Sequence, residues 1–148
     1  MSQQGPARAE EGEAIRTFFE GLTPAGLEQL NRIYDEEARF RDPFNEVVGI
    51  AAIRRIFADM FEQAPDARFT VQEVIGAAPL LYVRWDFTFT PGRAKAPWSV
   101  EGVSRLALGE DGRIVEHIDY WDPAAGIYER LPLLGTVLRW VRRRLAAD

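Results

Sequence analysis

His117, Asp119 and Asp42 are the residues of this sequence whose types and spacing indicate acid/base chemistry. His117 is the single histidine among 148 residues, and the chain contains no cysteine. These counts exclude thiol nucleophiles, disulfides, iron–sulfur clusters, zinc sites with thiolate ligands and metal sites built from several histidines. Acid/base catalysis would therefore use His117 or run on carboxylates.

His117 and Asp119 lie two residues apart in a segment whose side chains alternate as in a strand. The alternation places both on one face, together with Trp121. A carboxylate at this distance raises the proton affinity of an imidazole and fixes its orientation. Two interpretations stay open: a catalytic pair, or a structural pair in which Asp119 satisfies a half-buried His117.

Asp42 stands directly before Pro43, at the end of a short predicted strand from Ala38 to Arg41. Proline pushes the preceding residue into an extended or turn conformation. One interpretation is an Asx turn, in which the Asp42 carboxylate accepts hydrogen bonds from local backbone N–H groups. The other interpretation is a catalytic base, and it depends on the resemblance described below.

Helices and then strands must position these residues. Apolar residues at helical spacing predict a helix that ends near Gly21, a second that starts at the Thr23–Pro24 cap and reaches Tyr34, and a third that opens at Gly49. Beyond Pro65 the apolar period changes from 3.6 to 2, which predicts an antiparallel meander. Its four strands are expected at residues 68–76, 80–90, 98–108 and 113–121. This order predicts an α+β domain with its helices on one face of a curved sheet.

Charge is unevenly spread along the chain. Residues 1–126 carry 13 basic and 21 acidic side chains, whereas residues 127–148 carry 5 and 2. The acidic body lacks the basic surface expected of a nucleic-acid binder. Without a signal-peptide core or a long apolar run, the sequence predicts a cytoplasmic protein.

Residues 131–147 form a predicted basic amphipathic helix, with Leu134, Val137 and Val141 on its apolar face and Arg139 and Arg143 opposite. Three alternatives stay open for it. The helix packs on the body or across the mouth of a pocket, makes a dimer contact, or binds weakly to an anionic membrane surface.

The order of helices, Asp-Pro turn and meander resembles the nuclear transport factor 2 superfamily, which includes ketosteroid isomerases and SnoaL-like polyketide cyclases. The resemblance spans residues 12–123. It is carried by Tyr34–Phe44, by Gly49 with Ile53 and Phe57, and by Asp111–Ile114 leading to Tyr120–Trp121. It implies a cone-shaped, curved antiparallel sheet wrapped around three N-terminal helices within residues 1–130, with residues 131–148 as a separate helix. It also implies a homodimer formed through the outer sheet face.

The ketosteroid isomerase pattern, carried over residue by residue, places the carboxylate base of such enzymes at Asp42. The tyrosine that is the first acid of the oxyanion hole falls on Phe18, and its supporting tyrosine falls on Phe57. The protonated aspartic acid that is the second acid falls on Ser104, a poorer donor. The third tyrosine of the network corresponds to Tyr34. A phenyl ring donates no hydrogen bond, and losing one such donor costs about 10²–10³ in rate. Steroid isomerisation by that mechanism is therefore not expected.

SnoaL-like cyclases imply an acid/base aspartate on this sheet, which corresponds to Asp119 with His117 as its partner, both facing a pocket. We hypothesise that Asp42 or Asp119 abstracts a proton from an activated carbon while His117 polarises or reprotonates an oxygen, with no metal or organic cofactor. The expected substrate is a small hydrophobic carbonyl compound or epoxide. The predicted substrate-binding residues are Phe18, Tyr34, Phe57, Trp85, Trp98, Ser104 and Trp121.

A non-catalytic function is the alternative. In a ligand-binding or dimeric association module of the same fold, Asp42, His117 and Asp119 would only orient a ligand or maintain the fold.

Overall fold

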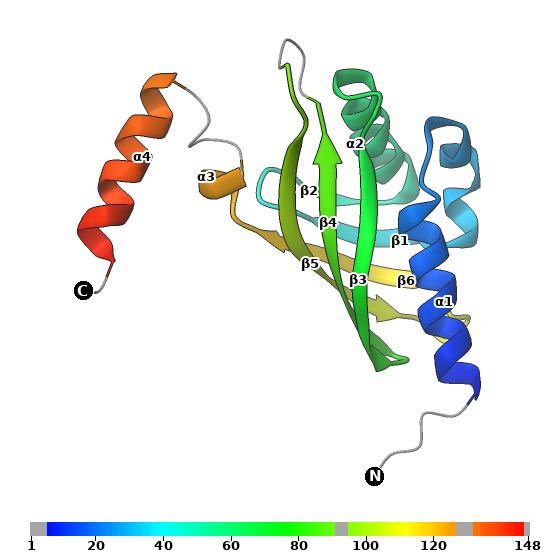
Figure 1. Ribbon diagram of the computed structural model, residues 1–148. Coiled ribbons are helices and arrows are strands. Elements are labelled where there is room, and N and C mark those ends of the chain that lie inside the picture. Colours follow the sequence, from blue (N-terminus) through cyan, green and yellow to red (C-terminus); the bar gives the residue numbers. More distant parts are fainter. Residues whose placement is uncertain (1–5, 91–94, 127–131, 147–148) are drawn as a thin grey trace.

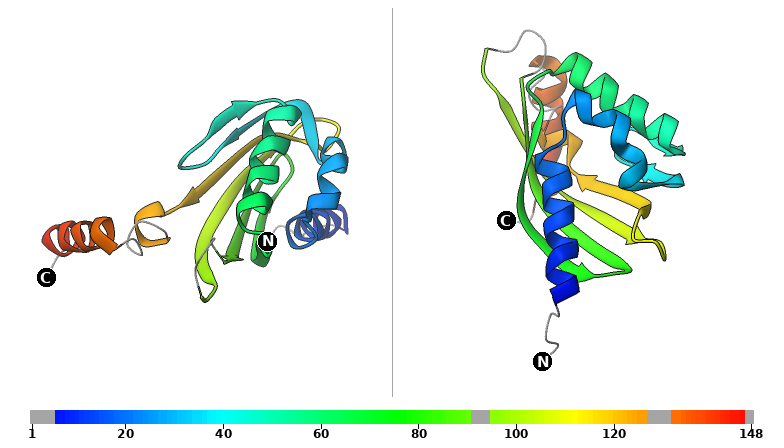
Figure 2. Two further views of the ribbon diagram at one scale, coloured as in Figure 1. Left: turned by 90° about the horizontal axis from the view of Figure 1, so that it is seen from above. Right: turned by 90° about the vertical axis from the view of Figure 1, so that its right-hand side faces the viewer.

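A curved six-stranded sheet with helices on one face forms the body of the protein (Figure 1). The computed structural model describes residues 6–90, 95–126 and 132–146. The helical elements are α1 (Pro6–Glu20), η1 (Pro24–Arg32), α2 (Ile50–Gln63), α3 (Pro123–Gly126) and α4 (Pro132–Leu145). The strands are β1 (Tyr34–Arg41), β2 (Glu46–Val48), β3 (Arg68–Ala77), β4 (Leu80–Phe89), β5 (Trp98–Leu108) and β6 (Ile114–Trp121). Figure 2 shows the sheet curving around α1, η1 and α2, so the fold class is the predicted α+β one.

The strand order across the sheet is β2-β1-β6-β5-β4-β3. The last four strands along the chain form the predicted antiparallel meander, and each of their ends lies within one residue of the expected position. Strands β1 and β2 extend the sheet beyond this meander. Strand β1 pairs in parallel with β6, which makes the sheet mixed and brings the first strand of the chain beside the last.

The second predicted helix differs from expectation, because it is a 3-10 helix that ends at Arg32. Its apolar residues Leu27, Leu30 and Ile33 recur every third residue, and three residues per turn is the period of a 3-10 helix. Thr23 caps it as predicted, since its hydroxyl accepts a hydrogen bond from the N–H of Gly26. Tyr34 therefore starts β1 instead of ending a helix, and β1 is four residues longer than the strand expected from Ala38.

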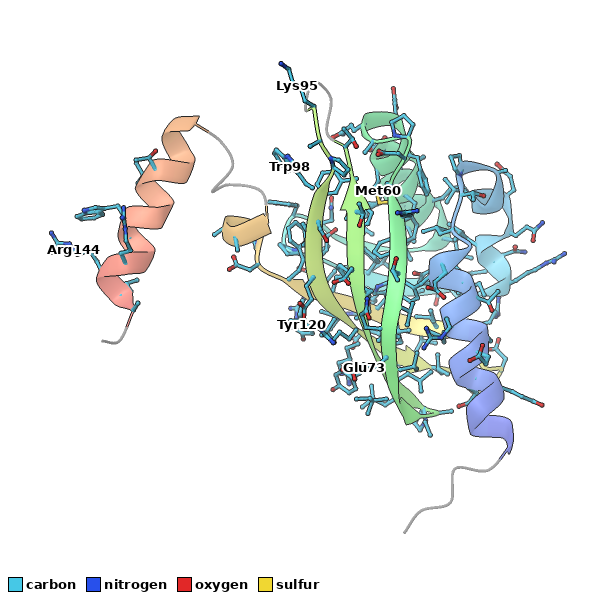
Figure 3. The ribbon with its side chains drawn as sticks, viewed as in Figure 1. Met60, Glu73, Lys95, Trp98, Tyr120 and Arg144 are labelled. Carbon is cyan, nitrogen blue, oxygen red and sulfur yellow. The ribbon has the colours of Figure 1, made fainter. Side chains whose placement is uncertain are left out.

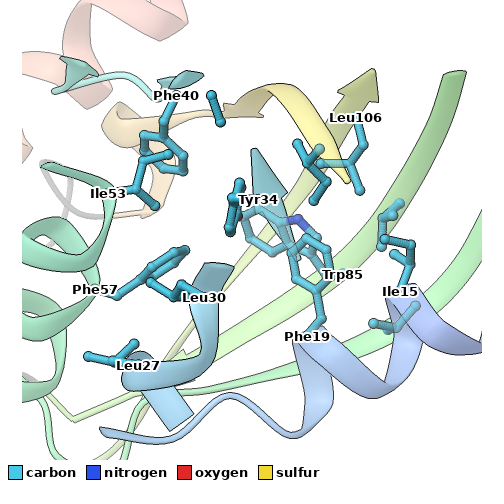
Figure 4. Close-up of a cluster of buried hydrophobic side chains, with 14 of the residues drawn as sticks. Ile15, Phe19, Leu27, Leu30, Tyr34, Phe40, Ile53, Phe57, Trp85 and Leu106 are labelled. Carbon is cyan, nitrogen blue, oxygen red and sulfur yellow. The ribbon is translucent and has the colours of Figure 1, made fainter. Parts of the chain in front are cut away.

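The core fills the space between the concave face of the sheet and the helices. Ile53, Phe57 and Phe61 of α2 and Phe19 of α1 are buried against it. Tyr34 lies within this cluster (Figure 4). Each large apolar side chain buried there contributes about 1.5–3 kcal/mol relative to full exposure.

Gly49 connects β2 to α2 with a φ of 101°, a conformation that side chains other than glycine rarely adopt. Its N–H donates to the carbonyl of Ala38, which ties the start of α2 to β1.

The helix α4 lies apart from the sheet domain in Figures 1 and 2. Its described apolar side chains Val137, Trp140, Val141 and Leu145 are exposed. The guanidinium of Arg144 lies 5.0 Å from the Trp140 ring, on the side of α4 away from the sheet (Figure 3). Among the described residues no extensive contact joins α4 to another element, and the three alternatives for this helix stay predictions. None of the described helices is long and apolar enough to cross a membrane.

Gly102 of β5 is expected to be intolerant of any side chain. A Cβ built at Gly102 overlaps the indole ring of Trp85, whereas a Cβ at Gly12 of α1 meets only Val74 at an ordinary 3.9 Å. We expect Gly102→Ala to lower the free energy of unfolding by about 1–3 kcal/mol. Gly12→Ala should be neutral or slightly stabilising. Urea denaturation of both variants checks this, and equal stability of the two would contradict the packing described.

Candidate active site

The last strand places His117 and Asp119 on its inner face, as the alternation predicted. His117 is 1% exposed, and the side chain of Asp119 is 14% exposed. The Nε2 atom of His117 lies 2.6 Å from Oδ1 of Asp119. The ring of Phe40 lies 4.8 Å from that of His117 in an edge-to-face arrangement. The imidazole is thus enclosed, and the carboxylate is the more accessible member of the pair.

Tyr34 completes the environment of His117 from the other side. Its hydroxyl oxygen lies 2.7 Å from Nδ1 of His117, although the two residues are 83 positions apart. The parallel pairing of β1 with β6 creates this contact, because it sets Tyr34 beside Ile114 and Phe40 beside His117. Both ring nitrogens of His117 are therefore engaged.

Ser104 and Trp85 extend the network onto the next two strands. Ser104 stands opposite Asp119 in the β5–β6 register, and its hydroxyl donates to Oδ1 of Asp119 at 2.5 Å. The indole N–H of Trp85 donates to Oγ of Ser104 at 2.8 Å. Ser104 also lies 3.2 Å from Nε2 of His117. The polar chain thus runs from β1 through β6 and β5 to β4.

One arrangement of protons satisfies every member of this network. Within the described residues, the buried hydroxyl of Tyr34 has Nδ1 of His117 as its one hydrogen-bond partner. If Nδ1 carried a proton, the Tyr34 hydroxyl would have no acceptor, which costs about 1–3 kcal/mol. The arrangement that leaves no buried donor unpaired has Tyr34 donating to Nδ1 and a neutral His117 donating its Nε2 proton to Asp119, and we assign this arrangement.

The pKa of Tyr34 agrees with this assignment. Burial raises it well above the usual value of 10.0, and the negative charge of Asp119 raises it further. Tyr34 consequently remains a protonated donor at any physiological pH.

A cavity of about 710 Å³ opens between the sheet and α2. Of the predicted site residues, those that line it are Asp42, Phe57, Trp85, Asp119 and Trp121. His117, Tyr34 and Ser104 are buried behind Asp119 and do not line it. Phe18 packs edge-on against Tyr34, with ring centroids 5.8 Å apart. Trp98, the first residue of β5, contacts Phe89 at the end of β4, with ring centroids 5.9 Å apart.

Asp42 forms the Asx turn that was one of its two interpretations. Its Oδ1 accepts the backbone N–H groups of Phe44 at 2.8 Å and Asn45 at 2.7 Å. The side-chain amide of Asn45 lies 3.1 Å from both Asp42 oxygens. Asp42 also borders the cavity, together with Asn45 and Phe44. Structural and functional roles for Asp42 are therefore compatible in space.

Several lining residues lie outside the predicted set of site residues. Phe87 and Phe89 line the cavity and share a strand face with Trp85, which the period-2 pattern of β4 predicts. The others had no signal in the sequence; besides Phe44 and Asn45, these are Phe40, Ile56, Asp59, Met60, Gln63, Ala64, Phe69 and Val100. In the described part of the chain, no group of three or more His, Cys, Asp or Glu side chains is arranged to hold a metal ion.

Residues 15–117 match the family model of the SnoaL-like domain. The chain belongs to this family. A comparison of the SnoaL-like chain with proteins of curated function found no match. The match runs from within α1 to the middle of β6 and includes both Tyr34 and His117.

Solved structures share the fold at low sequence identity. A candidate SnoaL-like polyketide cyclase from Jannaschia sp. CCS1 aligns with a TM-score of 0.72 and 18% identity over 84% of this chain and 94% of its own. A protein with a ketosteroid isomerase-like fold from Catenulispora acidiphila, solved in complex with trimethylamine, aligns with a TM-score of 0.66 and 15% identity over 78% of this chain and 87% of its own. AclR, a candidate hydroxylase from Streptomyces galilaeus, aligns with a TM-score of 0.64 and 18% identity over 93% of this chain and 92% of its own. These likenesses confirm the predicted cone-shaped fold.

The Tyr34 hydroxyl is expected to stabilise the SnoaL-like domain in a pH-dependent way. We expect Tyr34→Phe to lower the free energy of unfolding by about 1–3 kcal/mol at neutral pH, because Nδ1 of His117 loses its hydrogen-bond donor. The folded-state pKa of Tyr34 is raised, so the stability of the native chain is full below pH 10.0 and falls above it, where the unfolded chain releases its proton first.

The stability gap between the native chain and Tyr34→Phe should therefore narrow above pH 10.0. Urea denaturation of both proteins at pH values from neutral to above 10.0 measures this gap. Tyr82→Phe, which removes an exposed hydroxyl, is the matched control. A gap independent of pH would contradict the assignment.

Proposed function

We propose that this SnoaL-like protein is an acid/base enzyme that needs no cofactor, with Asp119 as the residue that exchanges a proton with the substrate. One observation carries the proposal. Asp119 is the titratable member of the buried network that also lines the cavity. Its Oδ1 accepts two hydrogen bonds, whereas its Oδ2 accepts none from the described residues. Oδ2 is therefore the oxygen available to a bound molecule.

The proposed reaction begins at a carbon next to a carbonyl group. Oδ2 of Asp119 takes the proton from that carbon, and the electron pair moves onto the substrate oxygen as an enolate. Return of the same proton to another carbon completes an isomerisation. Attack of the enolate carbon on a second carbonyl group, whose oxygen then takes the proton back from Asp119, would complete a cyclisation. A positioned general base of this kind contributes about 10²–10⁴ in rate.

His117 acts in this proposal as a positioning residue. Its Nε2–H holds Oδ1 of Asp119, and Tyr34 fixes the tautomer that makes this possible. Ser104 holds the same oxygen from β5. The sequence alone suggested direct contact of His117 with a substrate oxygen. Its enclosure behind Asp119 favours an indirect role instead.

Asp119 is preferred over Asp42 as the base, because the Asp42 oxygens already accept hydrogen bonds from Phe44 and Asn45. The aromatic lining supports a small hydrophobic substrate. The relative solved with trimethylamine supports the capacity of this fold to hold a small organic molecule.

A ligand-binding module without catalysis is the second candidate. The observation that favours it is the complete pairing of the buried hydroxyl, imidazole and indole groups, which a purely structural network would also show. The homodimer and the cytoplasmic location expected from the sequence stay predictions.

Substitution of Asp119 separates the two candidates. A panel of cyclic ketones, enones and epoxides is incubated with the protein in deuterated water, and NMR follows deuterium entering carbon positions. For a compound that exchanges, we expect Asp119→Asn to slow the exchange at least about 10²-fold. Asp42→Asn should slow it less than about tenfold. Equal rates for the native protein and a folded Asp119→Asn variant would reject the catalytic role.

We also propose that α4 contacts an anionic membrane surface. The exposed Val137 and Val141, the border position of Trp140 and the neighbouring arginines support this partner. We expect the full chain to co-sediment with anionic vesicles but not with neutral ones.

Val141→Glu should abolish this co-sedimentation, because it places a charge on the apolar face. Ala146→Glu, which makes the same charge change outside that face, should reduce it only partly. Equal loss for the two variants, or none for either, would reject the membrane contact.

A further inference from the structure

The cavity beside Asp119 combines aromatic walls with negative charge. Among its described lining residues are the three carboxylates Asp42, Asp59 and Asp119, and no lysine, arginine or histidine. Arg41 is exposed and does not line the cavity; it borders an adjoining open hollow that shares Asp42, Asp119 and Trp121 with it. A ligand in the cavity therefore meets carboxylates without an accompanying basic side chain.

Asp119 in particular has only neutral protein partners. Its hydrogen bonds come from Ser104 and from the neutral tautomer of His117. The Tyr34 hydroxyl that fixes this tautomer is neutral as well. A half-buried carboxylate is stabilised by an opposite charge nearby, and the protein supplies none at the cavity wall. A cation in the cavity would supply it.

The aromatic walls favour the same kind of ligand. Eight aromatic side chains line the cavity: Phe40, Phe44, Phe57, Phe69, Trp85, Phe87, Phe89 and Trp121. Phe69, Phe87 and Phe89 stack in series, with successive centroids 4.7 Å and 5.0 Å apart. Aromatic faces are negative and attract organic cations, most strongly where water is excluded.

We propose that the cavity binds an organic cation, in which a tertiary or quaternary ammonium group is joined to an apolar body. This inference deepens the proposed function, on which it rests for its site, by naming the charge class of the substrate. It also fits the proposed reaction. The ammonium group beside Asp119 would offset the negative charge that develops on the substrate oxygen, a task for which the cavity offers no basic side chain.

Three probes of one shape and different charge test the proposal. Benzyltrimethylammonium is the cation, neopentylbenzene is its uncharged carbon analogue, and phenylmethanesulfonate is an anion of similar size. Quenching of tryptophan fluorescence measures binding to the full-length protein, since Trp85 and Trp121 line the cavity. We expect the cation to bind at least about tenfold more tightly than the uncharged analogue, and the anion most weakly.

Two variants and a control assign the preference to the cavity. Asp119→Asn should remove most of the difference between the cation and its uncharged analogue. Asp59→Asn, at an exposed lining position of α2, should weaken only the cation, by up to about fivefold. Glu62→Gln makes the same charge change on α2 outside the lining and should leave all three affinities unchanged.

The uncharged analogue binding as tightly as the cation would overturn the proposal, and so would the absence of saturable binding by the cation. An unchanged preference in both aspartate variants would overturn it as well. Binding is measured without turnover, which separates the two proposals. A cation preference without proton exchange at Asp119 would reject only the enzymatic function, and proton exchange at Asp119 without a cation preference in the binding assay would reject only the cation site.

Discussion

The hydrogen bond between the Tyr34 hydroxyl and Nδ1 of His117 is the interaction on which the candidate site depends. It joins the first strand to the last, across the parallel β1–β6 pair. Because a buried hydroxyl needs an acceptor, it leaves Nδ1 without a proton and directs the Nε2 proton to Asp119. The orientation of the cavity carboxylate therefore follows from a contact on the far side of the imidazole.

Strand pairing in the sheet connects this hydrogen-bond network to the cavity wall. Ser104 reaches Asp119 only because β5 and β6 pair in the register that sets them opposite each other. Trp85 belongs to both the hydrogen-bond network and the cavity wall, since its indole N–H donates to Ser104 while its ring lines the cavity. Gly102 leaves room for that ring. Packing of the cavity wall and orientation of the Asp119 carboxylate are thus coupled through Trp85 and Ser104. A substitution that shifts the wall also changes the hydrogen bonds that orient the carboxylate.

Local pattern was enough to predict most of the fold. Strand alternation placed the meander to within one residue and put His117 and Asp119 on one face, and the Asp-Pro pair indicated the turn at Asp42. The three-residue spacing of Leu27, Leu30 and Ile33 fits two helix types, so it could not reveal that Tyr34 starts a strand. The β1–β6 pairing is a long-range contact that leaves no local signal. Strand alternation predicts the face of the sheet on which a side chain lies, but not how deeply that side chain is buried. It therefore could not show that Asp119 lines the cavity while His117 lies behind it.

The protonation state of the single histidine reports the direction of the Tyr34–His117–Asp119 hydrogen bonds. With one histidine in the chain, the imidazole nitrogens give one pair of resonances in ¹⁵N NMR, and these can be assigned without mutation. We predict a neutral ring at neutral pH, with the proton on Nε2 and none on Nδ1. A doubly protonated ring, or a proton on Nδ1, would contradict the proposed direction of the Tyr34–His117–Asp119 hydrogen bonds and the negative, uncompensated Asp119 that follows from it.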